Sequence, residues 1–348
     1  MAVFETASFD AHELVNFVSD RESGLRAIIA IHSTVLGPAG GGVRMYPYPS
    51  SSEALHDVLR LSRAMTCKIA LLGLPAGGGK TVVIGDPRQD KSEAVLEALG
   101  RAVEQLGGRY ICAEDVGTTP DDMTVIRRTT SYVTGLPDQG GDTSPLTGYG
   151  VFHAIRAAVR HRLGREELDG VTVAIQGAGG VGRSLAPHLA AAGARISIAD
   201  VVPEAARRVA EDVGGAVVSP ESVLSLDVEV LAPCALGAAL NDQTLPGIRA
   251  PIVCGGANNQ LEDDRHGQAL HERGILFVPD YVANCGGVIS GAAGLMGLGE
   301  EEARKRAEEI YGTCMRVFER AERDRVSTTL AAEEMAREIV EAAAARKD

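Results

Sequence analysis

Two lysines and an aspartate have residue types and settings that suit chemistry on a small anionic substrate. Lys68 lies in the apolar stretch AMTCKIALLGL, and Lys80 follows it by twelve residues in LPAGGGKT. Desolvating an ammonium group is costly, and both burial and a cationic neighbour lower the pKa of a lysine. One lysine can therefore bind a carboxylate while the other acts as a general base. Asp115, in AEDVGT, follows a buried strand, at the strand end where α/β active sites gather.

Each of these residues also has an ordinary explanation, such as a lysine stem lying along apolar surface or an aspartate beside a helix. The run GGGKT looks like a nucleotide-phosphate loop, but that motif needs glycine at position 74, where this chain has Leu74. The motif also opens a helix, whereas LPAGGGKT leads into the strand-like VVIGD. We therefore interpret the run as a glycine-rich turn that gives ligands access to Lys80. Another glycine cluster, GPAGGGVR at 37–44, can add backbone N–H groups.

A dinucleotide site is predicted where the strand-like VTVAIQ runs into GAGGVG at 177–182 and then into a helix. Gly177 allows the tight turn, Gly179 lets the backbone approach a pyrophosphate, and Gly182 allows the helix to pack closely on the strand. Gly180 and Val181 complete the loop at the helix N-terminus, which supplies amides and positive potential to the phosphates.

The preference for one cofactor is predicted from the next strand. The stretch ARISIAD ends in Asp200, 18 residues beyond Gly182, and no arginine follows until Arg207. A carboxylate there would accept hydrogen bonds from ribose hydroxyls and repel a 2′-phosphate. NAD is therefore the expected cofactor.

The elements that must position these groups alternate between strands and helices. Strand-like runs are found at 25–33, 82–86 and 109–113. Helices are expected to start after the capping residues Ser50 and Thr119. This alternation predicts sheets that are covered by helices.

The stretch GLPDQGGDTSP, at 135–145, has the composition of a linker. After it, the alternation of strands and helices restarts at 171–176 and continues to 275–281, and the chain is helical from about Glu300. Mostly parallel sheets and two α/β domains are therefore expected.

The bulk composition excludes several classes of protein. The 348 residues carry a net charge of −13 without a lysine- or arginine-rich block, so neither a nucleic-acid partner nor an anionic membrane surface is expected. The chain has no uncharged apolar run long enough for a transmembrane helix, and its first residues lack a secretion signal. The six cysteines are scattered without metal-ligand spacing, which predicts buried thiols in a reducing cytoplasm and no metal.

Together these segments resemble the Glu/Leu/Phe/Val dehydrogenase family, in particular its short branch of leucine, valine and phenylalanine dehydrogenases. The resemblance runs from about Ala27 to Glu341 and is carried, in order, by GPAGGGVRMYPY, AMTCKIALLGLPAGGGKTVVIGDP, GRYICAEDVGTTPDDM, SPLTGYGV, APCALGAALND, GGANNQL and PDYVANCGGVIS. It implies reversible, NAD-dependent oxidative deamination of an apolar L-amino acid, branched-chain or aromatic, to its 2-oxo acid and ammonia.

The resemblance also implies roles for individual residues. Lys68 would bind the substrate carboxylate with help from the amides of Gly41 and Gly42. Lys80 would be the general base that activates water for attack on the imino intermediate. Asp115 would exchange protons with the substrate amino group and the departing ammonia.

The family's cofactor contacts map onto the second half of the chain. Asn259, the second asparagine of GGANNQL, would orient the substrate amino group and the nicotinamide. Thr147, Cys234 and Ala235 would line the nicotinamide and its ribose. The implied chemistry requires no metal.

The family fold implies two α/β domains that flank a cleft. A substrate-binding and catalytic domain is expected at 1–135 and a Rossmann NAD-binding domain at 145–324. The helices from about 325 to 348 are expected to pack back on the first domain. Family members are homo-oligomers, so a homo-oligomer of unknown order is expected.

The side-chain pocket departs from the family pattern. The family commonly has GPALGGTR where this chain has GPAGGGVR, so Gly40 replaces a leucine that contacts the substrate side chain. Gly291 stands where a branched or bulky residue is usual. These two substrate-site glycines predict a substrate larger than leucine, such as an aromatic amino acid. Alternatively, Leu71, Leu72 or Met296 fills the space, and the specificity is for branched chains.

Two further functions stay open. One is reductive amination of a specialised, bulky 2-oxo acid in biosynthesis. The other is a non-catalytic relative that binds an amino acid or NAD as a sensor. The presence of Lys68, Lys80, Asp115 and Asn259 together disfavours the sensor.

Overall fold

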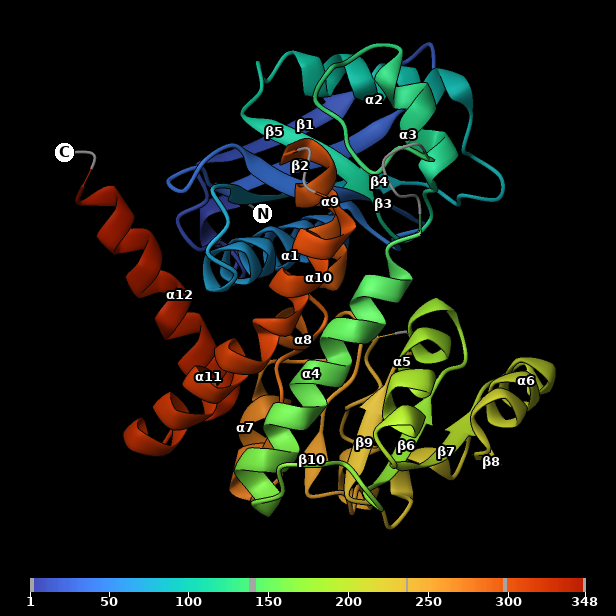
Figure 1. The fold of residues 1–348 in the computed structure, drawn as a ribbon. Helices are drawn as coiled ribbons and strands as arrows, with labels where there is room; N and C mark the ends of the chain where they lie inside the picture. Colours follow the sequence, from blue (N-terminus) through green and yellow to red (C-terminus); the bar gives the residue numbers. More distant parts are fainter. Residues whose placement is uncertain (1–2, 138–141, 236, 297–298, 347–348) are drawn as a thin grey trace. The chain divides into compact units, whose positions relative to one another are not determined.

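The computed structural model describes residues 3–137, 142–235, 237–296 and 299–346 (Figure 1). The chain forms two compact units. The first unit contains the chain up to Asp142 and the last residues from Ala336, and the second contains most of the chain from Thr143 to Met335. The division passes through two helices, α9 (Gly286–Met296) and α12 (Thr328–Ala344).

In the described part of the first unit, five strands form a mixed sheet in the order β1-β2-β4-β3-β5. They are β1 (Leu14–Ser19), β2 (Arg26–Ser33), β3 (Ala39–Tyr46), β4 (Gly77–Ile84) and β5 (Tyr110–Glu114). Strand β3 pairs in parallel with β4 and β5, whereas β2 is antiparallel to β1 and β4. The expected parallel pairing therefore fails at β1 and β2, because their short connection permits only an antiparallel pair.

Helices cover both faces of this sheet. Helix α1 (Ser51–Leu71) lies on one face, and α2 (Glu93–Glu104) and α3 (Pro120–Arg127) lie on the other (Figure 1). Alternate residues of β2 explain this arrangement, since Ile28 packs with α1 while Ile29 belongs to the core under α2 and α3. Two apolar faces are typical of a strand that is buried on both sides.

The predicted helix starts are confirmed by their capping contacts. The Ser50 side chain accepts a hydrogen bond from the Glu53 amide at the start of α1. Thr119 and Asp122 form a reciprocal capping box at the start of α3. These contacts satisfy amides that have no partner within the helix.

The described strands of the second unit form a wholly parallel sheet in the order β11-β10-β9-β6-β7-β8. They are β6 (Thr172–Gln176), β7 (Arg195–Ala199), β8 (Ala216–Val217), β9 (Val230–Pro233), β10 (Ile252–Val253) and β11 (Leu276–Phe277). Numbered from β6, this is the 3-2-1-4-5-6 order of a Rossmann fold. The predicted α/β class with a Rossmann second domain is confirmed.

The helices of the second unit begin with α4, which the sequence pattern did not predict. They are α4 (Ser144–Leu163), α5 (Gly180–Ala191), α6 (Pro203–Val213), α7 (Arg265–Glu272), α8 (Asp280–Ala283), α9, α10 (Glu300–Glu308), α11 (Ile310–Asp324) and the first part of α12. Helix α4 is buried around most of its circumference and therefore lacks the apolar stripe that marks a surface helix. It starts inside the predicted linker, of which residues 138–141 lie outside the described ones.

Within the described residues, every helix is too short or too polar to qualify as a membrane-spanning segment.

Candidate active site

A buried ion pair joins two of the predicted catalytic residues in the first unit. Lys80 lies in β4, and its Nζ is 3.0 Å from Asp115 Oδ2. Only 6% of Lys80 is exposed. Asp115 follows β5 directly, in a turn where its amide donates to Thr118 Oγ1 and Thr118 Oγ1 donates to the Val43 carbonyl. Strands β3, β4 and β5 therefore fix both partners of the pair.

Arg44 of β3 also contacts the Asp115 carboxylate, which the sequence reasoning missed. Its Nε lies 3.0 Å from Asp115 Oδ2, and its Nη1 lies 3.0 Å from Asp57 Oδ2 on α1. The Tyr48 hydroxyl donates to the same Asp57 oxygen. The available signal was the arginine two residues after the last glycine of GGGVR, in a segment expected to be close to the site.

Burial and charge shift the pKa values of the pair. Burial lowers the pKa of Lys80, and although Asp115 opposes this, Arg44 adds to it. Burial alone would raise the pKa of Asp115, but the Lys80 and Arg44 cations outweigh it and hold that pKa below its usual range. Asp115 is therefore a stable anion shared by two cations, and Lys80 can lose its proton more easily than an exposed lysine.

The glycines before Lys80 form part of strand β4, so the predicted glycine-rich turn is wrong. A Cβ on Gly77 would lie 2.0 Å from the Ser33 carbonyl oxygen, and one on Gly78 would lie 2.1 Å from the Thr66 amide nitrogen. A Cβ on Gly79 would lie 2.8 Å from the Tyr110 ring. The run is glycine because strand β2, helix α1 and Tyr110 press against β4, which a turn would not require.

The three consecutive glycines of GPAGGGVR, at 40–42, lie in β3 beside the pair. A Cβ on Gly42 would lie 2.7 Å from Asp115 Cβ and 3.1 Å from Lys80 Nζ. A Cβ on Gly41 would lie 1.8 Å from the Gly79 carbonyl oxygen. The buried Tyr110 hydroxyl donates to the Gly41 carbonyl at 2.8 Å, which fixes this part of β3. The missing side chains allow Lys80 and Asp115 to meet.

The remaining substrate-site predictions have different surroundings. Lys68 is 8% exposed on α1 and lies close enough for its charge to lower the pKa of Lys80 further. A Cβ on Gly40 would find Ile69 Cδ1 at 3.8 Å, which is ordinary contact. A Cβ on Gly291 would meet no described atom within 4 Å. The positions of Gly40 and Gly291, each considered in its own unit, have room for a side chain.

The glycine loop after β6 has the geometry of a dinucleotide site. Gly177 has φ +104°, and a Cβ on it would lie 2.8 Å from the Ala235 amide nitrogen. A Cβ on Gly182 would lie 1.9 Å from the Gly177 carbonyl oxygen, as expected where helix and strand pack closely. Gly179 precedes helix α5, and a Cβ on it would meet no described atom within 4 Å. The loop thus presents open backbone amides at a helix N-terminus, which fits a pyrophosphate.

Asp200 closes this loop from the end of β7. Its Oδ2 accepts from the Ala178 amide at 2.7 Å, and its Oδ1 accepts from the Val202 amide at 2.8 Å. Each carboxylate oxygen can accept a further hydrogen bond, so ribose hydroxyls can still bind. The acidic residue expected of a dinucleotide site is therefore held against its glycine loop.

Thr147 and Cys234 belong to segments that border the same loop. A Cβ on Gly180 would lie 2.3 Å from Ser144 Oγ, so the start of α4, which carries Thr147, adjoins the start of α5. The Thr147 hydroxyl donates to the Thr143 carbonyl. The Cys234 amide donates to the Gln176 carbonyl at 2.7 Å, and burial raises the pKa of its thiol to about 11. Cys234 is therefore a neutral lining residue.

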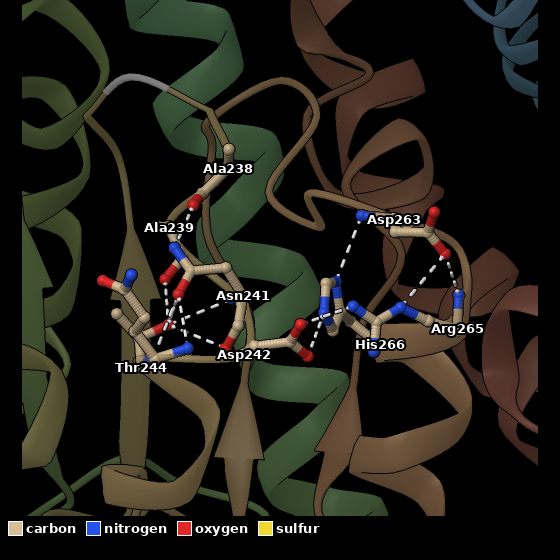
Figure 2. Close-up of polar contacts among 9 residues, drawn as sticks. Ala238, Ala239, Asn241, Asp242, Thr244, Asp263, Arg265 and His266 are labelled. Carbon is tan, nitrogen blue, oxygen red and sulfur yellow. Dashed lines mark hydrogen bonds and ion pairs between the residues drawn. The ribbon is translucent and has the colours of Figure 1, made fainter.

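Asn259 lies in a strained turn with φ +51°, and its carbonyl accepts from the Ala238 amide at 2.7 Å. Figure 2 shows the polar network that fastens the segments on either side of this turn. Asp242 binds Arg265 through one carboxylate oxygen and His266 through the other. Because His266 Nδ1 accepts from the Asp263 amide, its Nε2 carries the proton that Asp242 accepts. The network therefore fixes the chain on both sides of the Asn259 turn.

The predicted site residues thus form two groups. Those in the first unit are Lys68, Lys80, Asp115, Gly40, Gly41 and Gly42. Those in the second are Thr147, Gly177, Gly179, Gly180, Val181, Gly182, Asp200, Cys234, Ala235, Asn259 and Gly291.

Two family models match the chain. They are Glu/Leu/Phe/Val dehydrogenase, dimerisation domain, over residues 12–132, and Glutamate/Leucine/Phenylalanine/Valine dehydrogenase over residues 141–202 and 198–347. Leucine dehydrogenase of Bacillus cereus is 48% identical over 343 residues, which cover 98% of this chain and 94% of that protein.

Solved structures are similar along nearly the whole chain. The crystal structure of L-tryptophan dehydrogenase from Nostoc punctiforme is 43% identical with a TM-score of 0.86, and the match covers 98% of this chain and 99% of that one. A hetero-hexameric glutamate dehydrogenase from Thermus thermophilus, in its leucine-bound form, is 26% identical with a TM-score of 0.76 over 96% and 89% of the two chains.

Proposed function

Because this chain belongs to the Glu/Leu/Phe/Val dehydrogenase family and is an amino-acid dehydrogenase for apolar L-amino acids, we propose that it oxidatively deaminates a bulky apolar L-amino acid in a reversible, NAD-dependent reaction. The observation that carries the proposed chemistry is the buried Lys80–Asp115 pair, at 3.0 Å, beside two glycines that leave it room. A lysine with a lowered pKa next to a fixed carboxylate suits proton transfer near neutral pH.

In this proposal each residue has one task. Lys68 holds the substrate carboxylate with the amides of Gly41 and Gly42, and Asn259 orients the amino group. When bound, the nicotinamide supplies the hydride acceptor, so loss of hydride from Cα leaves an iminium on the substrate. The chain's own residues then carry out the hydrolysis.

Lys80, as a neutral amine, removes a proton from water while the water oxygen bonds to Cα, giving a carbinolamine. Asp115 passes that proton from Lys80 to the substrate nitrogen. Lys80, neutral again, then accepts the hydroxyl proton as the C–N bond breaks, and ammonia and the 2-oxo acid depart. The 3.0 Å distance between Lys80 Nζ and Asp115 Oδ2 suits this relay.

An activity panel tests the function directly. Purified protein with NAD and a series of L-amino acids is expected to form NADH, measured by its absorbance, and the reverse reaction with 2-oxo acid and ammonium is expected to consume it. Binding of amino acid or NAD by calorimetry without turnover would instead support a sensor. Activity confined to reductive amination of a specialised 2-oxo acid would support the biosynthetic alternative.

NAD rather than NADP is the proposed cofactor because the Asp200 carboxylate would repel a 2′-phosphate. Asp200→Asn removes the charge but keeps an oxygen for the loop amides. We expect it to raise the ratio of kcat/KM for NADP to that for NAD by about tenfold or more, because a carboxylate placed against a phosphate costs binding free energy. The exposed Asp212→Asn on α6 is the matched control. An unchanged ratio in Asp200→Asn would contradict this role.

A bulky, aromatic substrate is proposed because Gly40 and Gly291 leave space where the family usually has side chains. Relatives named for leucine and for tryptophan are both similar to this chain, so the choice between a branched-chain and an aromatic substrate depends on the residues of the side-chain pocket. Of the residues that could fill the space instead, Leu71 is buried, and the side chain of Met296 lies outside the described ones.

Gly40→Leu restores the usual side chain and is expected to lower kcat/KM for L-phenylalanine and L-tryptophan about tenfold or more while sparing L-valine. Parallel assays of both proteins with L-valine, L-leucine, L-phenylalanine and L-tryptophan give the comparison. A wild-type preference for L-valine would refute the enlarged pocket.

A homo-oligomer is part of the proposal, supported by the match of residues 12–132 to a dimerisation domain. Light scattering after size exclusion would measure its order. We also propose a cytoplasmic enzyme, in keeping with thiols such as Cys112 and Cys254 that are buried in the core.

A further inference from the structure

We propose that Arg44 is a positioning residue of this site, which holds the Asp115 carboxylate against Lys80 and keeps Asp115 anionic when Lys80 is neutral. This rests on the proposed role of Lys80 as the general base. It adds a residue that none of the assigned roles include, together with the two residues, Asp57 and Tyr48, that hold it in place.

The geometry shows how Arg44 is fixed. Its backbone lies in β3, which is paired on both sides by β4 and β5. Its side chain is 12% exposed and bridges two carboxylates with different nitrogens, Nε to Asp115 and Nη1 to Asp57, each at 3.0 Å. The planar guanidinium allows this fork, whereas a lysine presents a single point charge. The arrangement therefore sets the position of Asp115 Oδ2, the same oxygen that Lys80 contacts.

The Asp57 end of the fork is itself anchored. Tyr48, in the connection between β3 and α1, donates its hydroxyl to the Asp57 oxygen that Arg44 contacts. Burial first, and then Asp57, raises the pKa of Tyr48, so the phenol stays protonated and remains a donor. Asp57 cannot turn away from Arg44 without losing both contacts. The chain of contacts thus runs from Tyr48 to Lys80 without a break.

Charge balance explains why the site needs this arginine. Arg44 and Lys68 both lower the pKa of Lys80, and Arg44 also contacts the Asp57 and Asp115 carboxylates. Without Arg44, one of these two cations is lost and both carboxylates lose a positive partner, so Lys80 would hold its proton more tightly. Arg44 also stabilises the Asp115 anion, so that a proton leaving Lys80 is passed on rather than retained by the carboxylate.

The charged groups that act on the Lys80 proton include Arg44 of β3, Lys68 of α1 and Asp115 after β5. Tyr110 of β5 packs beside Gly79, and burial raises the pKa of its hydroxyl well above the ordinary value, so it stays neutral. Arg44 and Lys68 disfavour the Lys80 proton, and Asp115 favours it. Arg44 is the member of this set that contacts the Asp115 oxygen shared with Lys80.

Two substitutions of opposite sign test the proposal. In Arg44→Met, a cation is lost, so the pH at which kcat/KM rises is expected to move upward by about 1 unit or more. Because Asp115 is also displaced, kcat is expected to fall about 10²-fold. In Asp57→Asn, an anion is lost while the shape of the side chain is retained, so the rise of kcat/KM is expected at a lower pH than in wild type. A structural defect alone would not shift the two profiles in opposite directions.

A second readout does not depend on turnover. The chain has only five lysines, at 68, 80, 91, 305 and 347, so selective 13C labelling at lysine Cε gives few resonances to assign. The Lys80 resonance is expected to titrate about 1 unit or more higher in Arg44→Met than in wild type. Arg128→Met, which removes an exposed arginine that pairs with Glu93 and Glu97, is the control and should shift neither readout.

Arg44→Lys returns the positive charge but not the planar group that bridges Asp57 and Asp115. We therefore expect it to bring the Lys80 titration close to that of wild type while kcat stays lower. A folded Arg44→Met protein with unchanged Lys80 titration and an unchanged pH profile would overturn the proposal. If wild type shows no turnover at all, the proposed function fails, while the Lys80 titration still tests the role of Arg44.

Discussion

Replacing Lys80 by methionine is expected to lower kcat for L-amino-acid oxidation by about 10³-fold, the scale of a lost general base. Methionine has a similar length and is stable in an apolar setting, so the site should remain packed. Asp115 keeps Arg44 as a partner at 3.0 Å and is not left as an unpaired buried charge. The measurement is steady-state kinetics with the preferred substrate, together with NAD binding by calorimetry, which should be unchanged.

The matched control is Lys91→Met. Lys91 also contacts a carboxylate, Asp122, at 2.7 Å, and also belongs to the first unit. It lies outside the group of residues proposed to carry the chemistry, so kcat should stay within about twofold of wild type, as for substitutions away from a site. Full activity in Lys80→Met would remove the general-base assignment, and an equal loss in both variants would attribute it to folding.

The pH dependence of wild type gives a related expectation. The neutral amine is the base, so kcat/KM should rise with pH as Lys80 loses its proton. Burial, aided by Arg44, lowers the pKa of Lys80, so the rise should lie below the range of an ordinary lysine. In Lys80→Met this rise should be absent.

The Rossmann unit could be predicted from the sequence because its signals are local. GAGGVG follows a strand directly, and Asp200 ends the next strand, so the loop and the acid are read from short stretches. The structure then adds only their contact, with the Ala178 amide donating to Asp200. The order of the strands needed the three-dimensional structure, because β9 pairs with β6 across more than fifty residues.

The first unit was less predictable because its features depend on neighbours distant in sequence. Gly77, Gly78 and Gly79 looked like a turn, but their lack of side chains reflects contacts from β2, α1 and Tyr110. Arg44 was missed for the same reason, since its partners Asp57 and Asp115 lie 13 and 71 residues away. The sequence singled out Lys80 and Asp115 by their settings, and the family resemblance implied their individual roles. The mixed sheet explains how they come together.

The second large effect is expected for Gly42→Ala. The added Cβ would lie 2.6 Å from the Glu114 carbonyl oxygen and 2.7 Å from Asp115 Cβ, so the end of β5 must move. Backbone atoms yield less easily than the tip of a flexible side chain, and overpacking of this kind costs about 1–3 kcal/mol. Because the shift carries Asp115 away from Lys80, kcat should fall about 10²-fold, as for a misplacement of roughly 1 Å.

Gly40→Ala is the control for this prediction, two residues earlier on the same strand. Its Cβ would find Ile69 Cδ1 at 3.8 Å, an ordinary contact, so both the melting temperature and kcat for a small substrate should stay close to wild type. Thermal unfolding and steady-state kinetics on both variants separate the two positions. If Gly42→Ala retained wild-type kcat, β5 would have to accommodate a methyl group without moving Asp115, and the tight Lys80–Asp115 geometry would not be what limits the reaction. If the two variants lost activity equally, the loss would follow from replacing any glycine of β3, and the specific contact at Gly42 would no longer explain it.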